Sequence, residues 1–251
     1  MYAVLAPQVA SRFTRPRFLV ILDNGPSAKC VQDLLLFRSS DAKISSVEEA
    51  GKVSIPRLQR GPALSEDGDA AQRGQARQSH KTVDFSLWGL ERENILIATS
   101  HSNLPEEQCM VWASTVLMDS IHPDRVIVAG TMPAMSYRGP DDPSQEELVF
   151  QLATTKWEQV PSTKVLPPGN LVTGLSAAVL QICHSHSVPA CSVISVQNNI
   201  MPSLQLVCAQ ADVVSKLLWG TPLMLENAVK KDVAKALDNM YQSSASNSIF
   251  I

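Results

Sequence analysis

The sequence predicts an α/β fold: a single domain with a mostly parallel sheet flanked by helices on both faces, one hairpin and a flexible C-terminal tail. Short, wholly apolar runs bounded by turn residues are typical of strands buried on both faces. Segments with apolar residues at helical spacing lie between these runs, and such alternation favours parallel strands joined by crossover helices. With 251 residues, 45% of them hydrophobic, the chain can build one large core.

The first hundred residues contain three predicted strands and one predicted helix. Residues 17–22 form an apolar strand that ends at an Asn-Gly-Pro turn. Residues 27–37 carry apolar side chains at helical spacing. Residues 38–81 are polar and rich in Gly and Pro, so we expect a flexible surface loop. Two further runs, 83–90 and 95–98, flank a short polar turn and predict a hairpin.

The best-specified helix follows this hairpin. Ser102 or Asn103 can cap its start, and Pro105, Glu106 and Glu107 are favoured in its first turn. A His-Pro pair at residue 122 ends it. Its inner face carries Cys109, Trp112, Ala113, Val116, Leu117 and Ile121.

The second half of the chain repeats the pattern. Residues 125–129 and 190–196 are predicted strands, and the pattern leaves the type of residues 147–157 open. The predicted helices are residues 174–186, the later part of 204–219, and a last helix from Pro222 to about Tyr241. We therefore assign residues 1–241 to one domain and residues 242–251 to a tail.

Composition argues against several classes of partner. The formal net charge is −3, whereas a nucleic-acid-binding protein usually shows a basic excess. The longest apolar runs have about five residues, and a membrane-spanning helix needs about 20. Five scattered cysteines without a CxxC motif are typical of a reducing compartment. We expect no nucleic acid and no membrane as partners, and a location in the cytoplasm and also in the nucleus.

One serine invites a catalytic interpretation. The segment from Gly174 to Ala178 resembles a nucleophile elbow around Ser176, at the start of a predicted helix. That fold needs an acid and then a histidine after the serine. Here the last histidine is His186 and the first later acid is Asp212, so the order is wrong. The sequence favours a helix-start serine.

A metal or cofactor is also not favoured. Cys183, His184, His186 and Cys191 are crowded, but helix positions two apart diverge by about 200° and Cys191 follows on a strand. A structural zinc site usually needs four convergent ligands. The chain has neither a GxxxxGK[ST] nor a GxGxxG motif. We expect no catalytic residue, no metal and no cofactor.

The C-terminal end has a different character. Gln242–Ile251 is a Ser/Asn-rich stretch that ends in Ile249, Phe250 and Ile251, and ten residues can extend about 33–36 Å. A receptor could bury these side chains in the terminus-capture mode of peptide recognition. The alternative is that the tail folds back onto its own sheet. The sequence leaves both open.

The segment Asn170–Ala190 resembles the proteasome assembling chaperone 1 family, in which an Asn-hydrophobic-Val run precedes a Leu-x-Ala-Ala-Val-Leu helix, a cysteine and a Pro-Ala strand entry. Residues 17–25 resemble that family's first strand and turn. The resemblance implies a heterodimer with proteasome assembling chaperone 2 that binds α-type subunits and promotes α-ring assembly. It also implies a hydrophobic–tyrosine–any tail that docks between α-subunits. Here Ile249, Phe250 and Ile251 occupy those positions, with phenylalanine in place of tyrosine.

Two further hypotheses remain from the residues alone. A small-molecule enzyme, hydrolase-like or phosphorylase-like, would place its groups at the carboxyl ends of the strands, where Asn24, Ser100, His101 and Asn198 are the candidates. An adaptor would use the same tail on an unrelated receptor. A deep pocket favours the enzyme, whereas a flat apolar face favours the chaperone.

Overall fold

The computed structural model of the chain describes residues 13, 15–23, 26–41, 47–56, 82–100, 104–158, 163–198, 202–223 and 227–247. The strands are β1 (Phe18–Leu22), β2 (Val47–Pro56), β3 (Thr82–Leu90), β4 (Ile95–Ser100), β5 (Arg125–Pro133), β6 (Val149–Ala153) and β7 (Ala190–Gln197). The helices are α2 (Pro26–Asp41), α3 (Glu106–Ser114), α4 (Gly174–Ser185), α5 (Leu204–Trp219) and α6 (Asn227–Asn247), with a π-helix η1 (Thr115–Ile121) and a 3₁₀ turn η2 (Ala134–Ser136).

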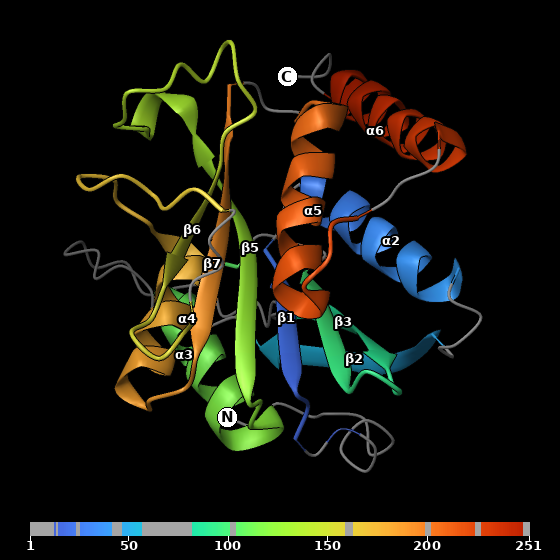
Figure 1. Cartoon of the computed structure of the whole chain (residues 1–251). Coiled ribbons are helices and arrows are strands. Elements are labelled where there is room, and N and C mark those ends of the chain that lie inside the picture. The colour runs from blue at the N-terminus through green and yellow to red at the C-terminus, as the bar shows by residue number, and fades with distance from the viewer. Residues whose placement is uncertain are drawn as a thin grey trace, which may run out of the picture.

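The strands form one sheet in the order β2-β3-β4-β1-β5-β7-β6 (Figure 1). Its centre is parallel, because β1 pairs with β4 and β5, and β5 pairs with β7. The strands β3 and β6 pair antiparallel with β4 and β7, and β2 pairs antiparallel with β3. The predicted fold class and the hairpin are confirmed.

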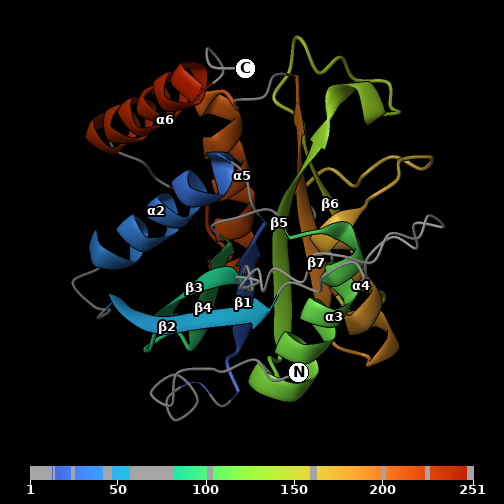
Figure 2. The ribbon, with the colours of Figure 1, turned by 180° about the vertical axis from the view of Figure 1, so that it is seen from behind.

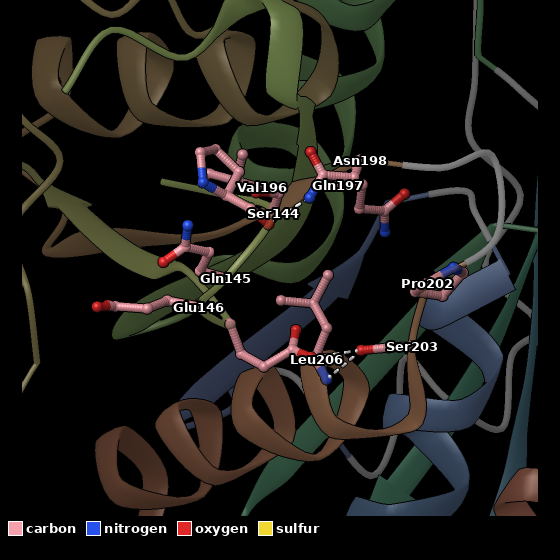
Figure 3. A pocket seen from close by; sticks show the side chains of 11 residues that line it. Ser144, Gln145, Glu146, Val196, Gln197, Asn198, Pro202, Ser203 and Leu206 are labelled. Carbon is pink, nitrogen blue, oxygen red and sulfur yellow. Dashed lines mark hydrogen bonds between the residues drawn. The ribbon is translucent and has the colours of Figure 1, made fainter. Parts of the chain in front are cut away.

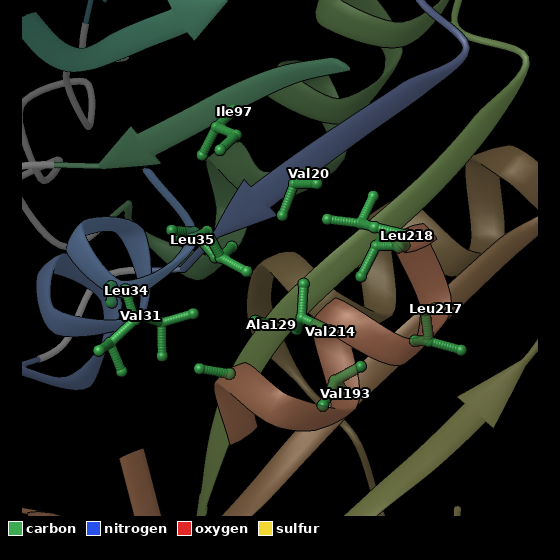
Figure 4. Close-up of a cluster of buried hydrophobic side chains, with 14 of the residues drawn as sticks. Val20, Val31, Leu34, Leu35, Ile97, Ala129, Val193, Val214, Leu217 and Leu218 are labelled. Carbon is green, nitrogen blue, oxygen red and sulfur yellow. The ribbon is translucent and has the colours of Figure 1, made fainter. Parts of the chain in front are cut away.

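Helices cover both faces of the sheet (Figures 1 and 2). On β1, Phe18, Val20 and Leu22 pack in the cluster that contains α2, α5 and α6 (Figure 4), whereas Leu19 and Ile21 pack in the cluster that contains α3, η1 and α4. Successive strand side chains point to opposite faces, so a strand covered on both sides must be apolar throughout. This requirement explains the wholly apolar run at residues 18–22.

The two helical layers are attached to the sheet in different ways. The buried side chain of Gln210 on α5 donates hydrogen bonds to the carbonyls of Gly130 (2.8 Å) and Val193 (3.2 Å). On the opposite face, Trp112 of α3 packs against Phe85 of β3 with ring centroids 4.4 Å apart. One layer therefore has a buried polar tie to the sheet, and the other has an aromatic contact.

The predicted loop at residues 38–81 is wrong in part. Residues 38–41 continue α2, and residues 47–56 form the edge strand β2, with an irregularity between Glu49 and Gly51. An edge strand is covered by a neighbour on one side only, so it tolerates the polar, Gly-containing sequence that predicted a loop. The remaining residues of this prediction, 42–46 and 57–81, lie outside the described residues.

The helix that starts at residue 106 also differs from its prediction. Its N-cap is Pro105, with no side-chain cap bond, so the predicted cap at Ser102 or Asn103 is wrong. From Thr115 the helix widens to π-helical geometry, and the amide of His122 bonds to the carbonyl of Leu117, five residues back. His122 then adopts a left-handed conformation (φ 49°), which ends the helix at the predicted residue.

The last two helices differ from their predicted bounds. The segment 147–157, whose type the sequence left open, contains the strand β6. The whole of residues 204–219 is helical, and residues 149–153 form a strand. The last helix starts at Asn227 instead of Pro222 and continues to Asn247, so residues 242–247 of the predicted tail are helical. Extending an existing helix by one residue costs little, because nucleation has already occurred. Ile249–Ile251 lie outside the described residues.

Candidate protein-interaction site

Ser176 has a packing position that explains its place in the sequence. It lies in the first turn of α4 with 4% of its surface exposed. A Cβ atom added to Gly130 would lie 2.6 Å from its Oγ atom. The serine therefore occupies the space that the glycine leaves on β5. This close contact supports the structural interpretation of Ser176 over the catalytic one.

The cysteines have properties of buried structural thiols. Burial is the largest cause that raises the pKa of Cys183 and Cys191 to about 12, and the pKa of Cys30 and Cys109 to about 11. Burial also raises the pKa of the half-buried Cys208. The thiolate is the nucleophile and metal ligand, so these thiols are poorly suited to either role at neutral pH.

The crowded Cys/His segment is spread over two elements. Cys183 is buried in α4 and Cys191 in β7, whereas His184 and His186 are exposed. Within the described ranges, no three His, Cys, Asp or Glu side chains gather in a way that could hold a metal ion.

Of the four candidate enzyme residues, the structure describes Ser100 and Asn198. Ser100 is buried at the end of β4, and Asn198 follows β7 and donates its side-chain amide to the carbonyl of Pro143. Two strands, β1 and β5, separate β4 from β7 in the sheet, so the two residues lie at least about 14 Å apart at the usual strand spacing. Asn24 and His101 lie outside the described residues. Ser100 and Asn198 therefore do not form one reactive site.

A polar hollow of about 160 Å³ lies beside the end of β7 and the start of α5 (Figure 3). The Oγ atom of Ser203 accepts a hydrogen bond from the amide of Leu206 (3.0 Å) and donates one to Oε1 of Glu147 (2.8 Å). The protein's own carboxylate thus stands at the positive end of α5, where a helix favours negative charge. This arrangement serves the helix and needs no ligand.

Charges beside this hollow are also paired within the chain. Lys164 Nζ lies 3.4 Å from a carboxylate oxygen of Asp141 and 3.4 Å from one of Glu146. Hydrogen bonds from the amide (2.9 Å) and hydroxyl (2.8 Å) of Ser144 lower the pKa of Asp142. Such exposed pairs contribute little to stability, and they leave this loop polar and solvated.

The most exposed large apolar side chains of the described residues lie on two neighbouring loops. Met135 on η2 is 83% exposed, and Leu171 in the loop before α4 is 76% exposed. We call this pair the loop platform. A second hollow, of about 180 Å³, lies beside it and is lined by the platform's Leu171 together with Ser136, Val172 and Thr173 among others.

The side chain of Asn170 holds the two loops of the platform together. Its Oδ1 accepts from the amide of Arg138 (2.7 Å), and its Nδ2 donates to the carbonyls of Arg138 (2.7 Å) and Pro167 (2.9 Å). The guanidinium of Arg138 donates in turn to the carbonyls of Met135 (3.0 Å) and Tyr137 (3.2 Å). These bonds fix the backbone of both loops.

The platform is also anchored in the core. Tyr137 is buried and stacks on Phe150 of β6, with ring centroids 5.4 Å apart. Its ring lies so close to Gly139 that an added Cβ would be 2.0 Å from the hydroxyl oxygen, so only glycine is accommodated there. A rigid backbone that presents Met and Leu to solvent binds another surface with little ordering cost, which makes the platform a candidate protein-interaction site.

Sequence reasoning missed this platform. Met135 and Leu171 lie in stretches for which the sequence predicts neither a strand nor a helix. The predicted binding residues, Ile249, Phe250 and Ile251, lie outside the described residues, so the structure does not place them. Since α6 reaches Asn247, residues 242–247 are helical and do not form an extended spacer.

No protein-family model and no curated protein matches the sequence. Solved structures do match. The archaeal proteasome activator PbaB from Pyrococcus furiosus has a TM-score of 0.58 at 12% identity, over 92% of this chain and 94% of that chain. PbaA from the same organism, an archaeal homolog of proteasome-assembly chaperone, has a TM-score of 0.55 at 13% identity, over 93% and 96%.

A proteasome-assembly chaperone homologue from Mycobacterium tuberculosis has a TM-score of 0.53 at 10% identity, over 90% of this chain and 94% of that chain. The fold of this chain is thus similar to that of proteasome-assembly chaperone homologues along nearly its whole length. This confirms, at the level of the fold, the resemblance seen in the sequence. Among the described helices, none is long and apolar enough to cross a membrane.

Proposed function

We propose that the protein is a non-enzymatic chaperone of proteasome assembly, which works as a heterodimer with proteasome assembling chaperone 2 and binds α-type subunits of the core particle in the cytoplasm and also in the nucleus. The observation that carries the proposal is the fold. The similarity covers more than nine-tenths of this chain and of each Pyrococcus protein, so it concerns the whole domain and not a shared substructure.

The local chemistry supports binding over catalysis. Four of the five described cysteines are buried, burial raises the pKa of their thiols, and the buried Ser176 is used for packing. The loop platform offers apolar surface on a fixed backbone. A chaperone of this kind acts by differential binding, because it must hold a partial α-ring more tightly than the mature particle. The enzyme alternative is not favoured by any feature of the described residues.

The tail adds a second contact in this proposal. Ile249 and Phe250 would enter a groove between α-subunits, with Ile251 at the position that follows. Burying Ile or Phe side chains contributes about 1.5–3 kcal/mol each before the cost of ordering the segment is subtracted. Because α6 extends to Asn247, the tail would start from a helix close to the ring instead of reaching it through a long spacer.

The test is co-purification with α-type subunits, followed by affinity measurement on α-rings. Deletion of residues 249–251 should weaken α-ring binding at least tenfold and leave the thermal midpoint and the contact with the partner chaperone unchanged. The matched control replaces Ser246 with Ala, a small change outside the tail motif. Unchanged α-ring affinity after the deletion contradicts the role of the tail. Recovery of no proteasome component with the wild-type protein contradicts the function itself.

A further inference from the structure

The helical layer formed by α3, η1 and α4 has an unusual charge distribution. These three elements contain no Lys or Arg, and their carboxylates are Glu106, Glu107 and Asp119, all exposed. The other layer, formed by α2, α5 and α6, has exposed charges of both signs, for example Lys29, Asp33, Lys231, Asp232 and Asp238.

Exposed apolar side chains lie between the acids of the first layer. Met110 and Val111 on α3 each have 38% of their surface exposed. Glu106 and Glu107 precede them by one turn, and Asp119 follows two turns later, so the acids bracket them within about 20 Å along the helix. Met118 of η1 and Leu180 of α4 are only partly buried. Figure 2 shows α3 and α4 side by side on the outside of the molecule.

The internal needs of the fold explain only part of this pattern. The positive end of α3 accounts for Glu106 and Glu107, since a helix start favours acids. It does not account for Asp119, for the missing Lys and Arg, or for the exposure of Met110 and Val111 on a helix whose inner side chains already fill the core. An apolar centre with polar or charged side chains around it is typical of an interface core and its rim.

We propose that this outer face, centred on Met110 and Val111, is the docking surface for a different polypeptide whose contact face is apolar and rimmed by Lys or Arg. Charge complementarity decides the occupant. A second copy of this chain, docked through the same face, would bring the acids of one copy close to those of the other with no Lys or Arg between them, and such like-charge contacts disfavour a homodimer. A basic-rimmed chain gains from the same charges.

This inference rests on the proposed function, because there the occupant is the related chaperone of the heterodimer. It also separates two surfaces. The loop platform with Met135 belongs to the β5–β6 end of the sheet, whereas Met110 and Val111 belong to the helical layer on one of its faces. Two surfaces allow the protein to hold its partner chaperone and a proteasome subunit at the same time.

The first test is Met110→Lys combined with Val111→Lys, against Met135→Lys as the matched exposed Met-to-Lys control. The double variant should bind the related chaperone at least about tenfold more weakly, as expected when interface anchors are removed, with an unchanged circular-dichroism spectrum and thermal midpoint. The control should bind it with wild-type affinity. Equal affinity of the double variant and the wild type overturns the surface.

The second test addresses the charges. Glu107→Lys should slow association with the related chaperone several-fold at low salt, and the effect should shrink at high salt. Asp238→Lys on α6 makes the same change in net charge on the other layer and should leave the rate unchanged. Equal effects of the two variants overturn the role of the acidic rim.

The third test is a photo-crosslinking residue at position 111 in the full chain. Crosslinks to the related chaperone, at an apolar segment flanked by Lys or Arg, are expected. Crosslinks to a second copy, or only to residues 1–12 of the same chain, overturn the proposed occupant. If the wild-type protein captures no related chaperone and no α-subunit, the proposed function fails. A variant that still binds a partner captured by the wild type contradicts the docking surface alone.

Discussion

The two helical layers of this protein have similar interiors and different exteriors. Both bury apolar side chains against the same sheet: Val31, Leu34 and Val214 on one face, and Trp112 and Val179 on the other. On the outside, α2, α5 and α6 carry Lys and Asp, including the Lys216–Asp212 pair at 2.7 Å. The outside of α3, η1 and α4 has carboxylates without Lys or Arg, together with exposed Met and Val.

This difference shows that the core and the surface of a helical layer have different roles. Burial of apolar area stabilises both layers in the same way, because the hydrophobic effect depends on area and not on direction. Charges on the outer face contribute little to stability but decide which partner can approach. The layer of α2, α5 and α6, with charges of both signs, is therefore suited to face solvent. The layer of α3, η1 and α4, with carboxylates and no Lys or Arg, is suited to bind a partner.

The largest effect is expected from a substitution that tests whether the layer of α3, η1 and α4 depends on apolar packing. Trp112→Ala removes a side chain that is 1% exposed and packs against Phe85, so it should lower the free energy of unfolding by about 3–5 kcal/mol in urea titrations. Trp219→Ala on α5 is the matched change at a half-buried position and should cost less than half as much. Equal losses would mean that the two layers are packed alike at these sites.

A smaller effect is expected where α4 meets the sheet. Gly130→Ala would place its Cβ 2.6 Å from Oγ of Ser176, and the resulting overpacking should lower the free energy of unfolding by about 1–3 kcal/mol. In the double variant with Ser176→Ala, the nearest side-chain atom is the Cβ at 3.8 Å, so most of the loss should be recovered. The measurement is a double-mutant cycle in urea. Additive losses would contradict the contact.

The smallest effect concerns the thiols of the two layers. In the native protein at pH 8, Cys109 on α3 and Cys183 on α4 should not react with a thiol reagent, whereas the half-buried Cys208 on α5 should react first. All five should react in denaturant. Faster modification of Cys183 than of Cys208 in the native state would contradict this order.

The same thiols give a pH dependence with a defined sign. Unfolded thiols ionise near pH 9.0, and burial raises the pKa of Cys183 and Cys191 to about 12 in the native state. Between these values the native state keeps protons that the unfolded state loses. The contribution of these two thiols to the free energy of unfolding is therefore fully present below pH 9 and decreases as the pH rises from 9 towards 12.

Parts of the fold follow from local sequence because their requirements are local. Residues 18–22 are apolar throughout, and this is required of a central strand covered on both faces. A His-Pro pair at residue 122 ends a helix, since proline lacks the amide that the next turn would need. The chain order of Ser176 and the later His and acid already argued against a hydrolase.

Other parts depend on what lies beside a residue in three dimensions. The sequence of β2 is polar enough to predict a loop, and its pairing with β3 makes it a strand. The platform of Met135 and Leu171 depends on Asn170, which bonds to Arg138 across 32 positions of the chain. Gly130 is needed because Ser176 lies against it, and no local pattern relates these two residues.

By itself, then, the sequence determined the class of the fold, the apolar strands and most of the helices, because hydrophobic periodicity and turn chemistry act over a few residues. Tertiary contacts determine which helices share a face, that one helical layer has carboxylates without Lys or Arg, and that two loops far apart in the sequence present Met135 and Leu171 together. These properties arise when elements far apart in the chain come into contact. The free energy of such contacts cannot be predicted from any short segment of the sequence.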